Sequence, residues 1–254
     1  FEKEIDRAVA ENKVDFAVHS LKDVPSELPY GLVLACIPKR EAANDIFISK
    51  DGTTLGTIKN GSTIGTSSLR RAVQVSRIRP DLVVKPIRGN IETRIRKLQE
   101  GEFDGVVLAQ AGIARLGIDV KFEKLSTKDF PPSPGQGAIA IVSREDNNAL
   151  IQTLKTIEDP DSRIAVEAER SLSLFVDSGC RFPVGALAQI KGDKLTLQVT
   201  VYSIDGKKSI NVEKIGDPLQ AAELGKQAAT ELSQKGIAEL AKNWREKVEE
   251  WNKK

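Results

Sequence analysis

Positive charge is concentrated in one short stretch of the sequence. Between Arg70 and Lys97 the chain carries nine arginine and lysine residues against two acidic ones, a local charge of +7 in a protein whose net charge is +2. Such a concentration indicates an anionic ligand. The stretch has no aromatic side chain on which single-stranded nucleic acid bases would stack. The favoured ligand is therefore a small molecule that bears carboxylates or phosphates.

Several arginines of this stretch lie where ligands usually bind, and arginine suits two-pronged recognition of a carboxylate. Arg70 and Arg71 fall in the first turn of a helix predicted over 69–79, where unpaired backbone N–H groups already favour an anion. Arg88 ends a predicted strand, and Arg94 lies one turn into the next helix. For the other arginines and the last lysine of the stretch we expect a solvated surface: Arg77, Arg79, Arg96 and Lys97.

Two further segments carry groups that can do acid–base or nucleophilic chemistry. The loop 19–23 (His-Ser-Leu-Lys-Asp) directly follows a predicted strand. Cys180 lies beside a cationic residue, and a neighbouring cation favours the reactive thiolate form of a cysteine. Residue type alone also allows structural roles: a turn or N-cap for Asp23 and a buried side chain for His19 or Cys180. Cys36, within an apolar strand pattern, is expected to be a buried structural cysteine.

These residues must be positioned by alternating strands and helices. Over the first two thirds of the chain, strands alternate with helices of about ten residues, a pattern typical of βαβ units and a mostly parallel sheet. In such sheets ligands bind where strands end, and the polar loops 19–23, 65–68 and 88–90 occupy that position. The predicted strands are 14–18, 32–37, 46–48, 62–65, 82–87 and 106–109, with helices over 1–12, 69–79 and 91–99 and a short one ending at 116–117.

Two segments are expected to connect the domains. The densest Pro/Gly stretch, 131–137, predicts a crossing between domains, and a second crossing is expected near 38–44. The strand that follows, 138–142, could return to the first sheet.

The last third of the chain has a different pattern. Beyond Asp161 the sequence predicts a helix over 162–175, strands over 184–190, 194–203 and 208–215, a long helix with Asp217 as its N-cap, and a solvated helix end over 242–254.

The pattern therefore predicts an α/β fold with two lobes of mostly parallel sheet and a smaller α+β C-terminal domain with an antiparallel sheet. The expected boundaries are 1–40 with 138–158 for domain 1, 43–132 for the basic domain 2, and 160–254 for domain 3, which carries Cys180.

Composition narrows the class of protein. The 254 residues are 40% hydrophobic and 29% charged, as in a globular protein, and no apolar run has the length of a membrane span. Two cysteines exclude a disulfide scaffold and indicate a reducing compartment, which we take to be the cytoplasm. One histidine and two cysteines do not provide a zinc-finger ligand set, and we expect no metal.

Six motifs occur in the order found in one enzyme family. They are HSLKDVP (19–25), GTSSLRR (65–71), RGN followed by ETR (88–94), LAQAGIARLG (108–117), PGQGA (134–138) and SGCRFPVGA (178–186). The sequence therefore resembles the hydroxymethylbilane synthase, or porphobilinogen deaminase, family over nearly its whole length. The resemblance implies two lobes like those of periplasmic binding proteins, a cleft between them, and a third lobe that carries a cysteine.

The same resemblance implies the chemistry. Members of the family deaminate porphobilinogen and join four units head to tail into the linear tetrapyrrole hydroxymethylbilane, a transferase step of porphyrin and heme biosynthesis. A dipyrromethane cofactor, attached by a thioether to the cysteine that matches Cys180, primes the chain, and Asp23 matches the catalytic aspartate. The implied cofactor-binding residues are Ser20, Lys22, Ser67, Arg70, Arg71, Arg88, Gly89 and Gln136, and the implied substrate-binding residues are Arg88, Arg94, Arg115 and Ser68.

The sequence departs from the family pattern in two places. Ser178 stands where glycine is common, a mild change. The chain has no methionine and begins at Phe1 within a helical pattern, so we expect the family's N-terminal segment to be missing and domain 1 to be incomplete. The chain alone is then expected to be unstable or inactive, and a companion N-terminal fragment is plausible; otherwise we expect a monomer.

Two other functions remain open on the residues alone. A two-lobed binding module for an anionic metabolite would use the same lobes and arginines, but it would need neither Cys180 nor Asp23. Nucleic-acid binding through residues 70–97 predicts strong salt dependence and broad affinity for polyanions. We expect no nucleic acid or membrane partner.

Overall fold

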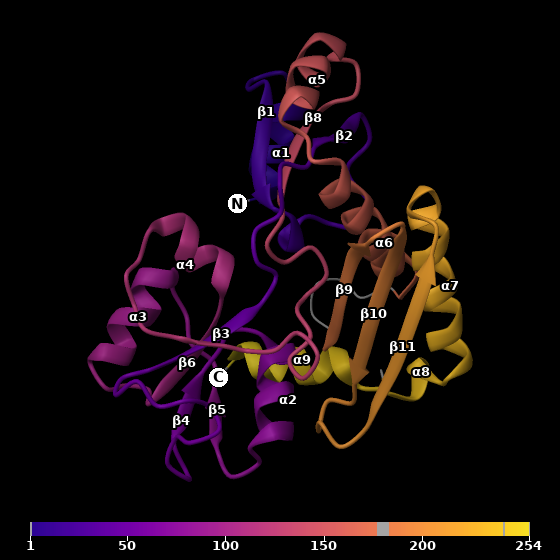
Figure 1. Ribbon diagram of the computed structural model, residues 1–254. Helices are drawn as coiled ribbons and strands as arrows, with labels where there is room; N and C mark the ends of the chain where they lie inside the picture. The colour runs from indigo at the N-terminus through magenta and orange to yellow at the C-terminus, as the bar shows by residue number, and fades with distance from the viewer. Residues whose placement is uncertain (1, 177–182, 241, 254) are drawn as a thin grey trace.

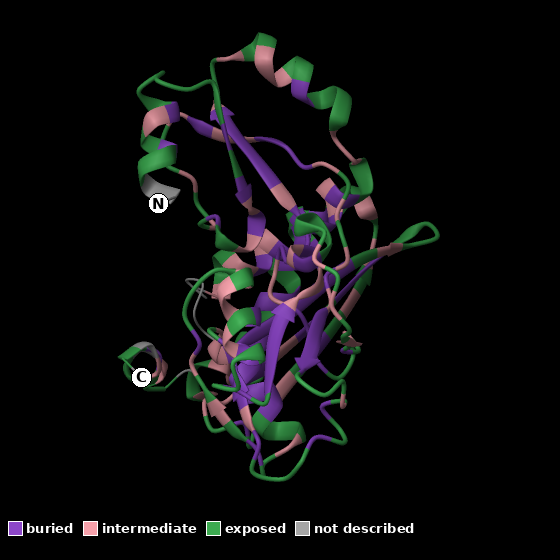
Figure 2. Ribbon diagram, turned by 90° about the vertical axis from the view of Figure 1, so that its left-hand side faces the viewer, coloured by how far each residue is buried: buried purple, intermediate pink, exposed green. Residues whose placement is uncertain are grey.

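The computed structural model describes residues 2–176, 183–240 and 242–253. The strands of these residues form three separate sheets, and helices flank each sheet (Figure 1). Figure 2 shows that buried residues gather in the sheets and that the helices carry most of the exposed ones. The predicted fold class is confirmed in kind: the first two sheets belong to α/β lobes, one of them with parallel strands, and the last sheet is antiparallel.

The first sheet joins the beginning of the chain to a segment more than a hundred residues later. Its elements are α1 (Glu2–Ala10), β1 (Phe16–Ser20), a 3-10 turn (Leu21–Asp23), β2 (Leu32–Cys36), β8 (Ile139–Arg144) and α5 (Asn148–Leu154), followed by a second 3-10 turn (Lys155–Ile157). The strand order is β1-β8-β2, so β8 returns to this sheet after the Pro/Gly crossing. Helix α1 covers one face through Val9, and α5 covers the other through Leu154.

The second sheet has the strand order β5-β4-β6-β3-β7. Its elements are β3 (Asp45–Ser49), β4 (Thr63–Gly65), α2 (Leu69–Ile78), β5 (Val83–Lys85), α3 (Ile91–Gln99), β6 (Gly105–Ala109), α4 (Gln110–Leu116) and β7 (Glu123–Lys124). Ile95 of α3 and Ile113 of α4 pack with Ile46 and Ile48 of β3 on one face, and Val75 of α2 packs with Phe47 on the other. This covering on both faces is the expected arrangement of an α/β lobe.

Parallel pairing is less extensive than the sequence predicts. Among the described strands it is confined to β4 with β5 and with β6, whereas β3 pairs antiparallel with β6 and β7, and β8 pairs antiparallel with β1 and β2. Parallel neighbours need a crossover, usually a helix, between them. Strands β3 and β8 enter their sheets directly from the crossing segments instead, and both run antiparallel to their neighbours.

The third sheet is an antiparallel meander with the order β11-β10-β9. Its elements are α6 (Pro160–Val176), β9 (Val184–Lys191), β10 (Lys194–Tyr202), β11 (Ser209–Gly216), a 3-10 turn (Pro218–Gln220), α7 (Ala221–Gln234) and α8 (Ile237–Leu240). The predicted N-cap is confirmed, because the Asp217 carboxylate accepts a hydrogen bond from the Leu219 N–H at 2.9 Å. A 3-10 turn separates this cap from α7. Leu172 of α6 and Leu232 of α7 are fully buried against the sheet.

The charged tail is not the solvated helix end that the sequence predicts. It forms α9 (Trp244–Lys253), and Val248 in the middle of this helix is only 3% exposed. The reason is an apolar stripe at helical spacing, Trp244, Val248 and Trp251, within a segment whose other residues are mostly charged. The proposed domain boundaries stay predictions. No helix in the described part of the chain combines the length and apolar character that a membrane crossing requires.

Candidate active site: an arginine-lined pocket

A cavity of about 760 Å³ opens where the three sheets and the tail meet, within the usual range for small-molecule sites. Lys22 and Asp23 come from the turn after β1, the Ser67–Arg71 segment begins α2, and Val184 begins β9. The lining residues are Lys22, Asp23, Ser67, Ser68, Leu69, Arg70, Arg71, Arg88, Arg94, Ser133, Gln136, Val184, Val248, Glu249, Trp251 and Lys253.

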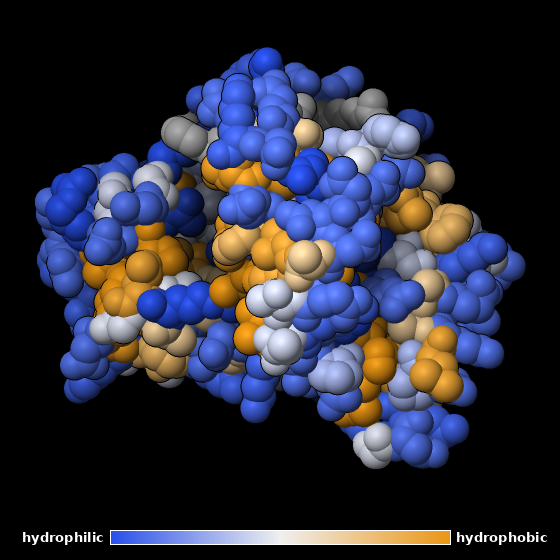
Figure 3. All heavy atoms as spheres, turned by 90° about the horizontal axis from the view of Figure 1, so that it is seen from above, coloured by the Kyte–Doolittle hydropathy of each residue, from blue (hydrophilic) through white to orange (hydrophobic). Residues whose placement is uncertain are grey.

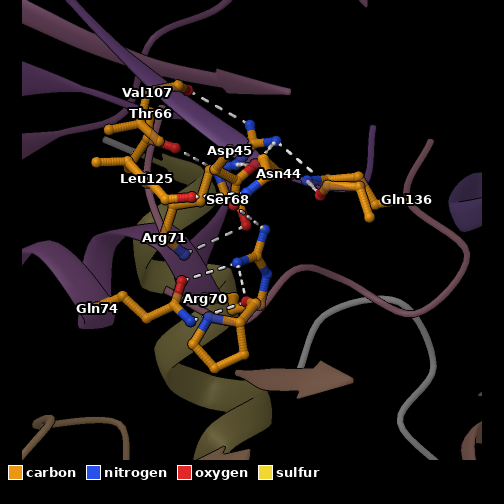
Figure 4. A network of polar contacts seen from close by, with 12 residues as sticks. Asn44, Asp45, Thr66, Ser68, Arg70, Arg71, Gln74, Val107, Leu125 and Gln136 are labelled. Atoms are coloured by element: carbon orange, nitrogen blue, oxygen red, sulfur yellow. Dashed lines mark hydrogen bonds and ion pairs between the residues drawn. The ribbon is translucent and has the colours of Figure 1, made fainter. Parts of the chain in front are cut away.

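The floor of this pocket is organised by one buried carboxylate. Asp45, the first residue of β3, is 0% exposed and accepts a hydrogen bond from Arg70 Nη2 at 2.7 Å and another from Arg71 Nε at 3.0 Å (Figure 4). Burial alone would raise the pKa of Asp45, but the two guanidinium groups outweigh burial and hold that pKa below its ordinary value. One negative charge therefore faces two positive charges, and this group of three residues has a net charge of +1.

The sequence brings both arginines to this carboxylate by starting helix α2 at the end of β4. Ser68 is the N-cap of α2, and its hydroxyl accepts a hydrogen bond from the Arg71 N–H. Arg70 Nη1 also donates to Gln74 Oε1 at 2.8 Å and to the Pro131 carbonyl at 2.6 Å. Arg70 Nε is buried and finds no hydrogen-bond acceptor among the described residues. A buried donor of this kind is costly to leave unpaired, so it indicates a place for a ligand acceptor.

The two crossing segments meet beside the same carboxylate. The amide of Gln136, in the second crossing, donates to Asp45 Oδ1 and to the Ala43 carbonyl of the first crossing, both at 2.7 Å. Gln136 Oε1 in turn accepts a hydrogen bond from Arg71 Nη2 at 3.2 Å (Figure 4). The side chain of Gln136 thus ties the passage between the lobes to the floor of the pocket.

A second buried carboxylate joins these crossings to the third sheet. Glu169 of α6 is 0% exposed, and its Oε1 lies 2.7 Å from Arg40 Nη1 of the first crossing. It also accepts hydrogen bonds from the Gly135 N–H at 2.6 Å and from the Ala188 N–H of β9 at 2.7 Å. Glu169 and Gln136 therefore join the two crossing segments to the second and third sheets beside the pocket.

The turn after β1 brings a cation and an acid to the pocket wall. Burial and the nearby Arg71 lower the pKa of Lys22 to about 8, although Asp23 and Asp45 act in the opposite direction. The second crossing approaches this turn so closely that a Cβ on Gly135, whose φ is +73°, would lie 3.2 Å from the Lys22 backbone nitrogen. Asp23 itself is exposed at the pocket.

The opposite wall carries Arg88 and Arg94. Arg94 Nε donates to the Gly89 carbonyl at 2.8 Å, which fixes the guanidinium beside the loop. Burial and the like charges of Arg71 and Arg88 lower the pKa of Arg94. Cations thus crowd one another around the pocket, and an anion placed between them would relieve their repulsion.

Most of the site residues inferred from the sequence lie in this pocket, but three of the described ones do not line it. Ser20 ends β1 just before the 3-10 turn, and Gly89 has a φ of +111° in a loop where a Cβ would contact Thr93. Arg115 is exposed and donates to the Gly137 carbonyl at 2.7 Å. Cys180 lies outside the described residues. Binding and catalytic roles stay predictions for these residues and for those that line the pocket.

Most residues expected to have ordinary roles have them, but Arg79 does not lie on a solvated face, because its side chain is only 15% exposed and donates to the Leu55 and Ile58 carbonyls. His19 is buried, and its Nε2 lies 2.9 Å from Asp6 Oδ1 of α1, while Cys36 is buried in β2. The cations assigned to the surface form contacts within the protein and do not line the pocket: Arg77 with the Gly206 carbonyl, Arg79 with Asp81, Arg96 with Glu100 and Lys97 with Glu102.

Sequence reasoning missed two parts of the pocket. Asp45 was not predicted, because no local sequence pattern indicates its role. Its partners, Arg70 and Arg71, lie 25 and 26 residues later in the sequence. The α9 residues that line the pocket were not predicted, because the high charge of the tail favoured a solvated helix end. They are Val248, Glu249, Trp251 and Lys253. The apolar spacing of Trp244, Val248 and Trp251 was the available signal for a packed helix.

Comparisons with known proteins show what this chain is similar to. Residues 1–152 match the family described as "Porphobilinogen deaminase, dipyromethane cofactor binding domain", and residues 163–234 match "Porphobilinogen deaminase, C-terminal domain". The chain is 68% identical over 253 residues to a probable porphobilinogen deaminase of Nitrosopumilus maritimus, covering 100% of this chain and 81% of the relative. It is 44% identical to the porphobilinogen deaminase of Syntrophobacter fumaroxidans, covering 94% of this chain and 78% of that protein.

Among solved structures, similarity extends to solute-binding proteins. A periplasmic binding protein of Salmonella typhimurium, whose structure concerns high arginine specificity, is 17% identical with a TM-score of 0.39, over 62% of this chain and 70% of that one.

The Asp45 cluster gives a direct test of the pocket floor. Asp45→Asn removes the charge but keeps the shape, and it leaves two buried guanidinium groups without a counter-ion. We expect the free energy of unfolding to fall by about 3–5 kcal/mol, measured by urea denaturation followed by circular dichroism. The control Glu100→Gln removes the partner of the exposed Arg96 and should cost about 0.5 kcal/mol or less. A comparable small loss for both variants would contradict the assigned role of Asp45.

Proposed function

The chain belongs to the porphobilinogen deaminase family, and from that premise we propose that the arginine-lined pocket is the site at which Asp23 acts on porphobilinogen. The family reaction, hydroxymethylbilane synthesis, is that of a transferase: it deaminates porphobilinogen and joins four units head to tail. The observation that carries the proposal is the position of Asp23, an exposed acid in the wall of a pocket otherwise dominated by cations.

The charges of the pocket fit the ligands of this reaction. Each pyrrole unit carries an acetate and a propionate, so every added unit brings two carboxylates. Arg70, Arg71, Arg88 and Arg94, together with Lys22, offer guanidinium and ammonium donors to such groups. The Ser67 and Ser68 hydroxyls add neutral donors beside them. The reactive aminomethyl group is cationic when protonated, and it would be attracted to Asp23.

The pocket also fits the dipyrromethane cofactor of the family. Two pyrrole rings with four carboxylates match a cavity of about 760 Å³, an unpaired Arg70 Nε donor and a surplus of positive charge. When bound, this cofactor supplies the free pyrrole carbon to which the first substrate unit is joined. We propose Lys22, Ser67, Arg70, Arg71, Arg88 and Gln136 as its binding residues, with Ser20 and Gly89 in the adjoining turns.

Cys180 is proposed as the residue that attaches the cofactor by a thioether. Its position lies outside the described residues, but Val184, four residues later in the sequence, lines the pocket. A thiolate is a soft nucleophile and forms a durable bond to the electrophilic methylene carbon that remains when porphobilinogen loses ammonia. The adjacent Arg181 in the sequence would favour the thiolate.

Asp23 would serve in both halves of each addition. As an acid it donates a proton to the departing amino group, so that the carbon–nitrogen bond breaks and ammonia leaves. As a carboxylate it then stabilises the positive charge that develops on the substrate methylene and pyrrole nitrogen. The new carbon–carbon bond forms with loss of a proton from the attacked ring, and Asp23 is placed to receive that proton. Positioned acid–base catalysis of this kind is worth about 10²–10⁴-fold.

Arg94, Arg88 and Ser68 are proposed to bind the carboxylates of the incoming substrate. Arg115, at the end of α4, is a further proposed binding residue that does not line the pocket. We further propose that the enzyme works in the cytoplasm, as a monomer and without a nucleic acid partner. The absence of aromatic residues from the 70–97 stretch supports the lack of a nucleic acid partner, and the presence of only two cysteines in the sequence supports a reducing compartment.

The first lobe supports a separate proposal, that a companion polypeptide segment packs on β1. Strand β1 is at the edge of its sheet, and Phe16 and Val18 on its outer side are 42% and 55% exposed. Ile5 and Val14 are also exposed nearby. Figure 3 views this lobe from above and shows hydrophobic atoms open to view among hydrophilic ones. An uncovered apolar edge strand is a template for pairing with further chain.

The central experiment compares two variants of the assembled enzyme by intact-protein mass and by turnover. Cys180→Ala should lack the mass of the covalent dipyrrole and should lose turnover. Asp23→Asn should retain that mass but lose turnover about 10²–10⁴-fold, because only the acid–base step is removed. Near-normal rates in Asp23→Asn would sink the catalytic assignment. Anion binding without any turnover in the wild type would instead favour a binding module.

The pKa of Lys22 predicts how substrate affinity depends on pH. Only the ammonium form attracts a carboxylate, and in the free protein that form is lost as pH rises through about 8. We therefore expect the affinity of the cofactor-free protein for porphobilinogen, measured by equilibrium titration, to fall above pH 8. In Lys22→Arg the side chain stays charged, so the fall near pH 8 should disappear. An identical profile in both proteins would show that Lys22 does not control binding.

The companion segment is tested by supplying one. Residues 1–254 expressed alone should be of low stability and should turn over little porphobilinogen. Co-expression with the 19% of the Nitrosopumilus maritimus relative that the chain does not span should raise both thermal midpoint and turnover. Phe16→Lys should abolish this rescue, whereas substitution of the exposed Tyr30, which lies outside the sheet, should not. Full turnover by residues 1–254 alone would rule out the need for a companion.

A further inference from the structure

Helix α9 forms one wall of the arginine pocket. Val248, Glu249, Trp251 and Lys253 line the cavity beside residues of α2 and of the Lys22–Asp23 turn. On its other side α9 borders a second hollow, lined by Ala72 and other α2 residues and by the β10–β11 turn. Figure 2 shows α9 nearly end-on at the edge of the molecule, outside the layers of the three sheets.

The attachment of this helix is strong at one end and weak at the other. Trp244, at its start, packs against the core of the third domain. Asn243 just before it has a φ of 62°, a left-handed conformation that asparagine tolerates and that turns the chain into α9. Toward the pocket, Val248 is the only described α9 side chain that is fully buried, and α9 shares no hydrophobic cluster of the core beyond Trp244.

The pocket end of α9 also contains an unpaired donor. Trp251 Nε1 is buried and has no hydrogen-bond partner among the described residues. The cost of leaving that N–H unpaired offsets part of the free energy gained by burying Val248. This offset weakens the packing of α9 on the pocket, and a ligand that binds the open pocket better shifts the helix away from it.

The charge of Glu249 is complementary to that of the pocket. Among the residues that line the cavity, six are cationic, and Asp23 and Glu249 are the acidic ones within the described chain. Glu249 thus brings from α9 a carboxylate of the same chemical class as the carboxylates of the substrate. No established role of the pocket requires this group, because the proposed reaction uses Asp23 as its acid.

We propose that α9 is a displaceable lid, and that Glu249 acts as an internal carboxylate that substrate carboxylates replace. The proposal rests on the proposed function, since it takes porphobilinogen as the ligand. Each unit added to the growing chain brings two further carboxylates into the pocket. Of its walls, α9 is the one that can move without breaking a sheet or the Asp45 cluster. Trp244 keeps the displaced helix tethered to the third domain.

Tryptophan fluorescence reports the movement directly, since the chain contains only Trp244 and Trp251. Adding porphobilinogen to the loaded Asp23→Asn enzyme, which binds without turning over, should shift the emission to longer wavelength and raise quenching by acrylamide. The change should vanish in the same enzyme with Trp251→Phe. An emission spectrum and quenching that stay constant on saturation with porphobilinogen would overturn the proposal.

Steady-state kinetics of α9 variants provide a second test of the lid. Glu249→Gln removes the competing carboxylate, so the open pocket becomes more populated and the KM for porphobilinogen should fall about fivefold with little change in kcat. Val248→Ala weakens the packing of α9 against the pocket and should also lower KM. Glu246→Gln, an exposed α9 residue outside the pocket lining, is the matched control and should leave KM unchanged.

The two proposals fail in different ways. An unchanged or raised KM in Glu249→Gln, with normal turnover by the wild type, would overturn the lid and leave the proposed function intact. Normal turnover by Asp23→Asn would overturn the catalytic assignment, whereas the movement of Trp251 on porphobilinogen binding would still measure the lid.

Discussion

The pocket depends on one unequal ion cluster, in which the buried carboxylate of Asp45 faces two guanidinium groups. Removing three charges from water is expensive, and the cluster survives because its geometry satisfies nearly every donor. The single exception described, Arg70 Nε, lies at the pocket. Folding therefore orders both arginines before any ligand binds, and it leaves one positive charge to be neutralised by a ligand.

The same cluster couples ligand charge to the arrangement of the lobes. Gln136 binds Asp45 and Arg71 from one crossing segment, and Ala43 of the other crossing accepts from Gln136. Glu169 then ties the crossings to β9 of the third domain. An anion that pulls on Arg71 acts on the segments through which the lobes are joined. On the proposed function, a growing, increasingly anionic product would be bound by residues that also connect the lobes.

Local signals in the sequence were sufficient for most elements. Helix α3 begins and ends where its periodicity predicts, and Asp217 caps as expected. Interactions between distant residues could not be read in the same way. The partners of Asp45 are not marked by any local pattern, and the antiparallel entry of β3 and β8 depends on crossings between lobes rather than on the strands themselves. The packed helix α9 was visible as an apolar stripe, but the charge around that stripe favoured a solvated helix.

Burial separates two aspartates that would otherwise compete. The substrate carries carboxylates and an amine, so its site needs many cations and one accessible acid. Asp45 is held entirely by arginines and is closed to solvent, which removes it as a partner for the amine. Asp23 lies exposed on a short turn beside Lys22, where cation and acid can meet opposite charges of one small molecule. Glu249 is a second exposed acid in the pocket, and on the lid proposal it leaves with α9 when the substrate carboxylates bind, so that Asp23 remains to meet the amine.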